Sequence, residues 1–92
     1  MGFSVDIDKV AEKTLKKLDK KTSARIRAWI DDHLDGCEDP RLFGKPLTGN
    51  FKDCWGYRVT DYRLIAKIDD GIKIINIEKI DHRNKVYKIW MI

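Results

Sequence analysis

The sequence predicts an α+β domain in which an N-terminal strand and two helices cover one face of a mainly antiparallel four-stranded sheet, followed by a short C-terminal helix. Two segments near the N-terminus have the apolar spacing of helices, three β-rich runs occupy the second half, and a turn-rich stretch separates the two halves. The chain of 92 residues suits one domain, residues 1–92, because it is too short to build a second core.

The N-terminal half is predicted to hold one strand and two helices. Residues 3–7 alternate apolar and polar side chains, as in a half-buried strand. Asp8 is placed to cap the first helix, and Thr22 or Ser23 to cap the second. The second helix has a core-facing stripe formed by Ile26, Trp29, Ile30, His33 and Leu34. Gly36 is expected to end this helix.

The second half is predicted to form a loop and then three strands. Residues 40–53 are rich in turn-forming residues and indicate a loop. The strands are expected at residues 54–60, 62–69 and 72–80. Two-residue loops at 60–61 and 70–71 would join these strands as hairpins. The tail, residues 84–92, is predicted as a short helix or a loose apolar end.

The two hairpin loops define a pairing register, and this register predicts a charged face. Arg58 would lie directly opposite Arg63, and Arg63 would lie opposite Glu78. The face away from the helices would then carry Arg58, Arg63, Lys67, Asn76 and Glu78, with Ile65, Ile74 and Ile80 between them. Opposed arginines repel each other, so the pair is either prepared for an anion or splayed into water. Glu78 is expected to hold Arg63 in position.

Composition and charge narrow the function classes. Residues 1–40 hold eight Lys/Arg against nine Asp/Glu, and residues 41–92 hold eleven against six. The basic half favours either a polyanionic partner or a merely soluble surface. No apolar run approaches the roughly 20 residues that span a bilayer, and no secretory signal is present. We therefore expect a cytoplasmic protein without a membrane partner. Cys37 and Cys54 lack disulfide-framework or zinc spacing, so no metal or cofactor is expected.

The residues after the last strand add His82, Arg83 and Tyr87 to the expected end of the charged face. Cleavage of RNA by internal attack requires a proton acceptor for the 2′-hydroxyl, a proton donor for the 5′-oxygen and positive charge around the phosphorane. One arginine can bind two phosphate oxygens at once, and histidine titrates near neutral pH. Tyrosine can stack on a base or orient a proton transfer. These residue types permit a metal-independent ribonuclease but do not identify one.

Three segments resemble motifs of the RelE/ParE toxin superfamily, and together they span nearly the whole chain. WGYRVTDYRLI at residues 55–65 resembles the central hairpin of RelE-type toxins. HRNKVY at residues 82–87 resembles their His-Arg-x-x-Val-Tyr signature, and KPLTG at residues 45–49 resembles their Lys-x-Leu-x-Gly loop. The resemblance implies the toxin of a type II toxin–antitoxin system: a ribosome-dependent endoribonuclease that cuts mRNA in the decoding site by 2′-hydroxyl attack.

The resemblance also implies residue roles and partners. Arg58 and Arg63 match positions that hold phosphate and stabilise the transition state, and Arg83 matches a further basic position. His82 matches a histidine that we interpret as an acid or base, and Tyr87 a tyrosine that stacks on the substrate or assists proton transfer. The implied partners are a cognate antitoxin, the ribosome with its mRNA, and operator DNA bound through the antitoxin.

One departure from the family pattern bears on activity. RelE-type nucleases often carry another cation two residues before Arg58, where this chain has Gly56. Lys45 or Lys52 is expected to supply that charge, and Lys67 is a further candidate for RNA binding. The departure leaves two alternatives open: a ParE-type inhibitor of DNA gyrase without nuclease activity, and a catalytically silent co-repressor that binds the antitoxin.

Overall fold

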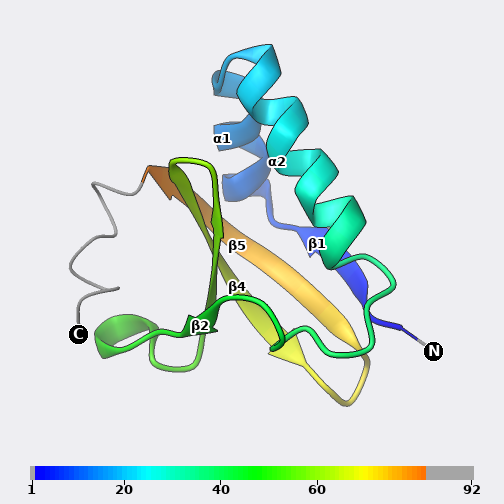
Figure 1. Cartoon of the computed structure of the whole chain (residues 1–92). Coiled ribbons are helices and arrows are strands. Elements are labelled where there is room, and N and C mark those ends of the chain that lie inside the picture. The colour runs from blue at the N-terminus through cyan, green and yellow to red at the C-terminus, as the bar shows by residue number, and fades with distance from the viewer. Residues whose placement is uncertain (1, 83–92) are drawn as a thin grey trace.

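The computed structural model describes residues 2–82, which form a five-stranded mixed sheet with both helices on one face (Figure 1). The strands are β1 (Ser4–Ile7), β2 (Lys45–Pro46), β3 (Trp55–Val59), β4 (Tyr62–Asp69) and β5 (Ile74–His82). The other elements are the helices α1 (Lys9–Lys17) and α2 (Lys20–His33) and the 3₁₀ turn η1 (Gly49–Phe51). Neither helix in this part of the chain is long and apolar enough to cross a bilayer.

The sheet has the order β1-β5-β4-β3-β2. β1 runs parallel to β5, and the other neighbours are antiparallel. The predicted α+β class is confirmed, and the two-residue strand β2 adds a fifth strand to the four predicted ones. The predicted C-terminal helix at residues 84–92 lies outside the described residues.

Each helix begins at an aspartate. Asp8 caps α1 and accepts a hydrogen bond from the Val10 backbone N–H at 3.4 Å, as predicted. α2 starts earlier than predicted, because Asp19 rather than Thr22 or Ser23 is its N-cap. The Asp19 carboxylate accepts hydrogen bonds from the backbone N–H and the hydroxyl of Thr22, at 3.1 and 2.6 Å. Only two residues therefore separate the helices.

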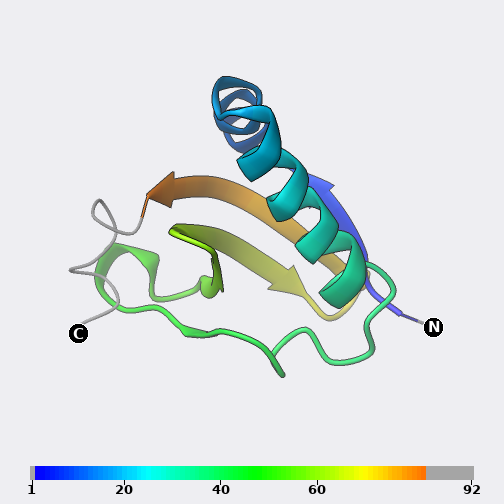
Figure 2. The ribbon, with the colours of Figure 1, turned by 45° about the horizontal axis from the view of Figure 1, so that its top comes forward.

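The face of the sheet beneath the helices, the helix-side face, forms the main core (Figure 2). Its fully buried side chains from the sheet are Tyr57, Leu64, Ala66, Ile75, Ile77 and Ile80. The helices and the end of α2 contribute Ala11, Leu15, Ile26, Ile30 and Leu34. The Tyr57 hydroxyl donates a hydrogen bond to the Pro40 carbonyl at 2.6 Å, so the polar atom of this buried ring is satisfied.

A smaller apolar cluster lies on the opposite face, which we call the loop-side face. Leu47, Cys54 and Ile65 are buried there, and Phe51 packs against them. Figure 2 shows the segment that contains β2 and η1 passing beneath the sheet, away from the helices. The middle of β4 is consequently buried on both faces.

The pairing of β3 with β4 is as predicted, whereas the pairing of β4 with β5 is not. Arg58 lies opposite Arg63, as the sequence predicts. The next connection spans residues 70–73 rather than 70–71, and a β-bulge follows at which Glu78 has no directly opposite residue on β4. Arg63 therefore lies opposite Asp81 and not opposite Glu78.

The bulge also reverses the faces predicted for the end of β5. An extra residue shifts the alternation of side chains by one position, so each later side chain points to the other face. Ile80 was predicted on the charged face, but it lies opposite Leu64 and is fully buried in the main core.

Replacement of Ile80 tests the bulge directly. We expect Ile80→Ala to lower the free energy of unfolding by about 2–5 kcal/mol, because it removes a fully buried side chain. Ile72→Ala is the matched control, since Ile72 is 67% exposed, and it should change stability by less than about 0.5 kcal/mol. Urea unfolding of both variants is the measurement. Similar small losses in both would contradict the burial of Ile80.

Candidate functional site

Two arginines lie side by side on the loop-side face, next to the β3–β4 turn. Arg58 and Arg63 are directly opposite each other on neighbouring strands, whose backbones are about 4.8 Å apart. Arg58 is exposed, whereas Arg63 is only 8% exposed. The Nη1 of Arg63 donates a hydrogen bond to the Tyr62 carbonyl at 3.4 Å. The pair thus combines one solvent-facing guanidinium with one that is held against the sheet.

The burial of Arg63 excludes one of the two interpretations that the sequence left open for this residue, a side chain splayed into water. A side chain splayed into water would be largely exposed, and Arg63 is not. Removing a guanidinium from water costs free energy unless opposite charge or hydrogen bonds compensate it. The protein therefore holds a second positive charge beside Arg58 in spite of the repulsion between them.

Asp81 is the carboxylate opposite Arg63. It occupies the facing position on β5, its side chain is 17% exposed, and its Oδ2 lies 3.3 Å from Lys79 Nζ. A row of Arg58, Arg63 and Asp81 therefore crosses three neighbouring strands. Sequence reasoning missed Asp81 because the bulge turns it to this face, and β5 contains no glycine that would have marked a bulge.

Lys45 approaches the same surface from β2. It lies directly opposite Gly56, two residues before Arg58 on β3. Opposite residues of an antiparallel pair share a face, so Lys45 is on the loop-side face with the arginines. Gly44 makes this approach feasible: it has φ +73°, and a Cβ there would lie 2.0 Å from the Gly56 carbonyl oxygen. The sheet thus places a lysine across from Gly56.

Lys67 lies farther along the loop-side face. It is four residues from Arg63 on β4, which corresponds to about 13 Å. Ile65, with its apolar cluster, lies between them. Lys67 Nζ is 3.9 Å from a carboxylate oxygen of Glu78, so the glutamate predicted for Arg63 is the neighbour of Lys67 instead.

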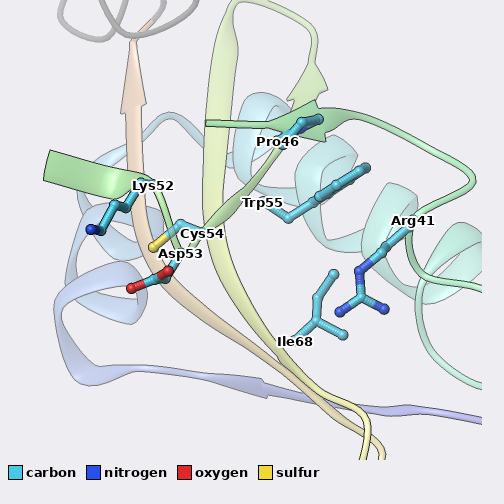
Figure 3. A pocket seen from close by; sticks show the side chains of 7 residues that line it. All are labelled: Arg41, Pro46, Lys52, Asp53, Cys54, Trp55 and Ile68. Carbon is cyan, nitrogen blue, oxygen red and sulfur yellow. The ribbon is translucent and has the colours of Figure 1, made fainter. Parts of the chain in front are cut away.

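Lys52 lines a cavity of about 210 Å³ beside the start of β3. Figure 3 shows Lys52 on one side of this cavity and Arg41 and Trp55 on the other. The Arg41 guanidinium donates two hydrogen bonds of 2.9 Å to the two carboxylate oxygens of Asp70. This cavity does not include the arginine pair.

Of the predicted C-terminal site residues, only His82 lies in the described part of the chain, and it is not on the same face as the arginine pair. His82 ends β5 opposite Tyr62, and the two rings meet edge to face with centroids 5.4 Å apart. Tyr62 packs against the main core, so His82 lies on the helix-side face rather than at the end of the charged face. The same bulge explains this difference. Arg83 and Tyr87 lie outside the described residues.

The arrangement is suited to holding a phosphodiester. A guanidinium offers parallel N–H donors to two phosphate oxygens, and a lysine adds a compact positive charge. Arginine does not lose its proton in proteins, so Arg58 and Arg63 stabilise negative charge but do not accept a proton. Within residues 2–82, no group of three or more His, Cys, Asp or Glu side chains is arranged to hold a metal ion.

Comparison with known proteins gives one family and several similar chains. Residues 5–87 match the model of a family described as the ParE toxin of the type II toxin–antitoxin system parDE. Toxin RelG of Mycobacterium tuberculosis (strain ATCC 25618 / H37Rv) is 28% identical over 88 residues, which cover 96% of this chain and 99% of the relative. Toxin RelE of the same strain is 29% identical over 87 residues, which cover 95% of this chain and 88% of the relative.

Solved structures share the fold. The RelBE2 toxin–antitoxin complex of Mycobacterium tuberculosis contains a chain with a TM-score of 0.80 and 28% identity, covering 90% of this chain and 93% of that one. A chain in the RelE–RelB complex of Pyrococcus horikoshii OT3 has a TM-score of 0.71 and 28% identity, and the match covers 92% of this chain and 99% of that one. The isolated E. coli RelE toxin has a TM-score of 0.70 and 22% identity, and the match covers 98% of this chain and 96% of that one. At this identity the similarity shows a shared fold only.

A double-mutant cycle tests the register that places Arg63 opposite Asp81 on β4 and β5. We expect Arg63→Gln and Asp81→Asn to show a coupling free energy of about 0.5–1 kcal/mol, because opposite charges face each other across the strands. The matched cycle of Arg63→Gln with Glu78→Gln should give a coupling near zero. Denaturant unfolding of the single and double variants is the measurement, and a larger coupling to Glu78 would contradict the observed register.

Proposed function

The chain belongs to the ParE toxin family of type II toxin–antitoxin systems, within the RelE/ParE superfamily, and we propose that it is a ribosome-dependent endoribonuclease that cleaves mRNA in the decoding site. The observation that carries the proposal is the arginine pair. Arg58 and Arg63 face each other on neighbouring strands, and Arg63 is held there although it is nearly buried. Two permanent positive charges at one place favour a bound phosphodiester.

In the proposed reaction, the 2′-hydroxyl of one nucleotide attacks its own 3′-phosphate. The new O–P bond gives a 2′,3′-cyclic phosphate, and the bond to the 5′-oxygen of the next nucleotide breaks. Arg58 and Arg63 neutralise the charge that develops on the phosphorane. Arg63 is already held by the sheet, so little side-chain entropy is lost when it binds. This chemistry requires no metal, because side chains supply the positive charge.

Lys45 is the third cation of the proposed site. It lies across from Gly56, where it supplies positive charge beside the arginine pair. Lys52 and Lys67 are proposed to contact RNA farther from the scissile phosphate, because the loop-side cluster separates Lys67 from Arg63 and Lys52 lines a separate cavity.

The proton transfers are proposed from the family motif at residues 82–87. Tyr87 would stack on the substrate or orient a proton, and Arg83 would contact phosphate. His82 would act as an acid or base. Because the His82 ring meets Tyr62 on the helix-side face, its part in the reaction requires the end of β5 to rearrange when substrate binds.

We also propose the partners of a type II toxin. The RelBE2 complex and the Pyrococcus horikoshii RelE–RelB complex each contain a toxin and an antitoxin. In each complex the chain that matches this protein is 28% identical to it. By this similarity, a cognate antitoxin would neutralise the protein, and the complex would bind operator DNA through the antitoxin. The reaction takes place where ribosomes translate mRNA, in the cytoplasm.

Inhibition of DNA gyrase is the second candidate function. It is favoured by the family model itself, which describes the ParE toxin, and by Gly56, which removes a cation from the central hairpin. A gyrase inhibitor has no need to stabilise a phosphorane. The two candidates therefore differ in whether the arginine pair is required for an RNA product.

A cell-free translation reaction tests the nuclease. Purified protein should create new 5′ ends at codon positions of the mRNA, mapped by primer extension, in the presence of ribosomes and not in a ribosome-free lane. Arg58→Ala should reduce the rate by about 10²–10³-fold, because it removes charge stabilisation at an exposed position. Lys73→Ala, an exposed cation in the β4–β5 connection, is the control. Intact mRNA together with inhibited gyrase would support the second candidate instead.

The role of Lys45 is tested in the same assay. We expect Lys45→Ala to lower the rate about tenfold, and Lys45→Arg to retain most of it, because the requirement is positive charge at this place. Lys52→Ala should have a smaller effect on the rate at saturating ribosome concentration. Equal losses in Lys45→Ala and Lys52→Ala would show that total charge matters rather than the position across from Gly56.

A further inference from the structure

Cations gather at the turn between α1 and α2. This set, the basic turn surface, consists of six exposed residues: Lys13, Lys16, Lys17, Lys20, Lys21 and Arg25. Asp19 is the one acidic residue in the sequence from 13 to 25, and its carboxylate accepts the two capping hydrogen bonds from Thr22. The turn therefore presents a strong positive charge with little internal compensation.

The far end of α2 has the opposite sign. Residues 28–40 contain no Lys or Arg, and their acidic residues are all exposed: Asp31, Asp32, Asp35, Glu38 and Asp39. Figure 1 shows the α1–α2 turn at the top of the molecule and the other end of α2 beside β1. A helix of 14 residues is about 21 Å long. The near-zero total charge of residues 1–40 thus conceals two separate surfaces of opposite charge.

The basic turn surface adjoins the hairpin that carries the arginine pair. Lys21 and Arg25 line a cavity of about 340 Å³ together with the β3–β4 turn, residues 60–62. Arg58 and Arg63 are the facing pair that follows one step inside this turn. The basic turn surface and the arginine pair therefore lie on either side of the hairpin turn, and the exposed carboxylate of Asp61 lies in the turn between them.

We propose that the basic turn surface binds the phosphate backbone of double-helical RNA. Exposed lysines on two helices present separate point charges, which suit the fixed rows of phosphates on an RNA duplex. Residues 13–25 include no aromatic side chain on which the bases of a single strand could stack. The surface is thus suited to a backbone rather than to unpaired bases.

The identity of that RNA rests on the proposed function. If the arginine pair takes the mRNA strand on the ribosome, the duplex within reach of the basic turn surface is ribosomal RNA. The acidic end of α2 would then face away from the RNA, so the charge separation orients the protein as it approaches. Binding to an RNA duplex is independent of catalysis and can be measured without it.

Two double variants with the same change in net charge separate a site from a general charge effect. Lys20→Gln/Lys21→Gln removes two cations from the basic turn surface, and Lys9→Gln/Lys73→Gln removes two exposed cations outside it. Their affinities for ribosomes, for a short blunt RNA duplex and for one of its single strands are measured over a series of salt concentrations. Thermal unfolding checks that both variants are folded.

The first variant should bind ribosomes and the duplex about tenfold more weakly or worse, with a salt slope reduced by about 1.5–2 because two phosphate contacts are lost. The second variant should change affinity less than about twofold. Cleavage at saturating ribosome concentration should be unaffected in the first variant, since the arginine pair is intact. If the wild-type protein binds the duplex but cuts no mRNA, the proposed nuclease activity is refuted, whereas the proposal that the basic turn surface binds RNA is not.

Three results would overturn the proposal. Equal losses in the two double variants would show a general charge effect without a site. If the first variant loses as much affinity for the single strand as for the duplex, the surface is not specific for double-helical RNA. A first variant that binds RNA normally but no longer binds the cognate antitoxin would assign the surface to an acidic protein partner.

Discussion

The central strand β4 must be covered on both faces, and this requirement shapes the rest of the molecule. Leu64 and Ala66 face the helices, and Ile65 faces the segment of β2 and η1 on the other side. Apolar side chains on both faces are stabilised only if each face is removed from water. Because the loop-side cluster occupies the middle of its face, the charged pair of Arg58 and Arg63 is confined to the hairpin end of the strands.

The bulge in β5 determines the electrostatic environment of that pair. A regular strand would have left an apolar side chain near Arg63, whereas the extra residue at Glu78 turns Asp81 toward it and Ile80 into the core. Arg63 then lies between a like charge and an opposite charge on its two neighbouring strands. The geometry of β5 therefore decides which charged side chain lies opposite Arg63.

The parts of the structure that follow from local signals could be predicted, and the parts that depend on long-range packing could not. The turn at 60–61 is short, and it correctly gave the pairing of Arg58 with Arg63. The bulge has no local marker, so the partner of Arg63 and the faces of Ile80 and His82 were predicted wrongly. The place of Lys45 across from Gly56 depends on the two-residue strand β2, which is too short to produce a periodic pattern.

Cys54 gives the loop-side cover an intrinsic chemical reporter. Its side chain is buried with Leu47 and Ile65, and this burial raises the pKa of the thiol. Alkylation requires the thiolate, so the raised pKa slows the reaction at Cys54. Cys54 also lines the cavity beside β3 together with Lys52 and Trp55. The rate of alkylation at Cys54 is therefore sensitive to how closely the loop-side cover packs around this cavity, without any introduced label.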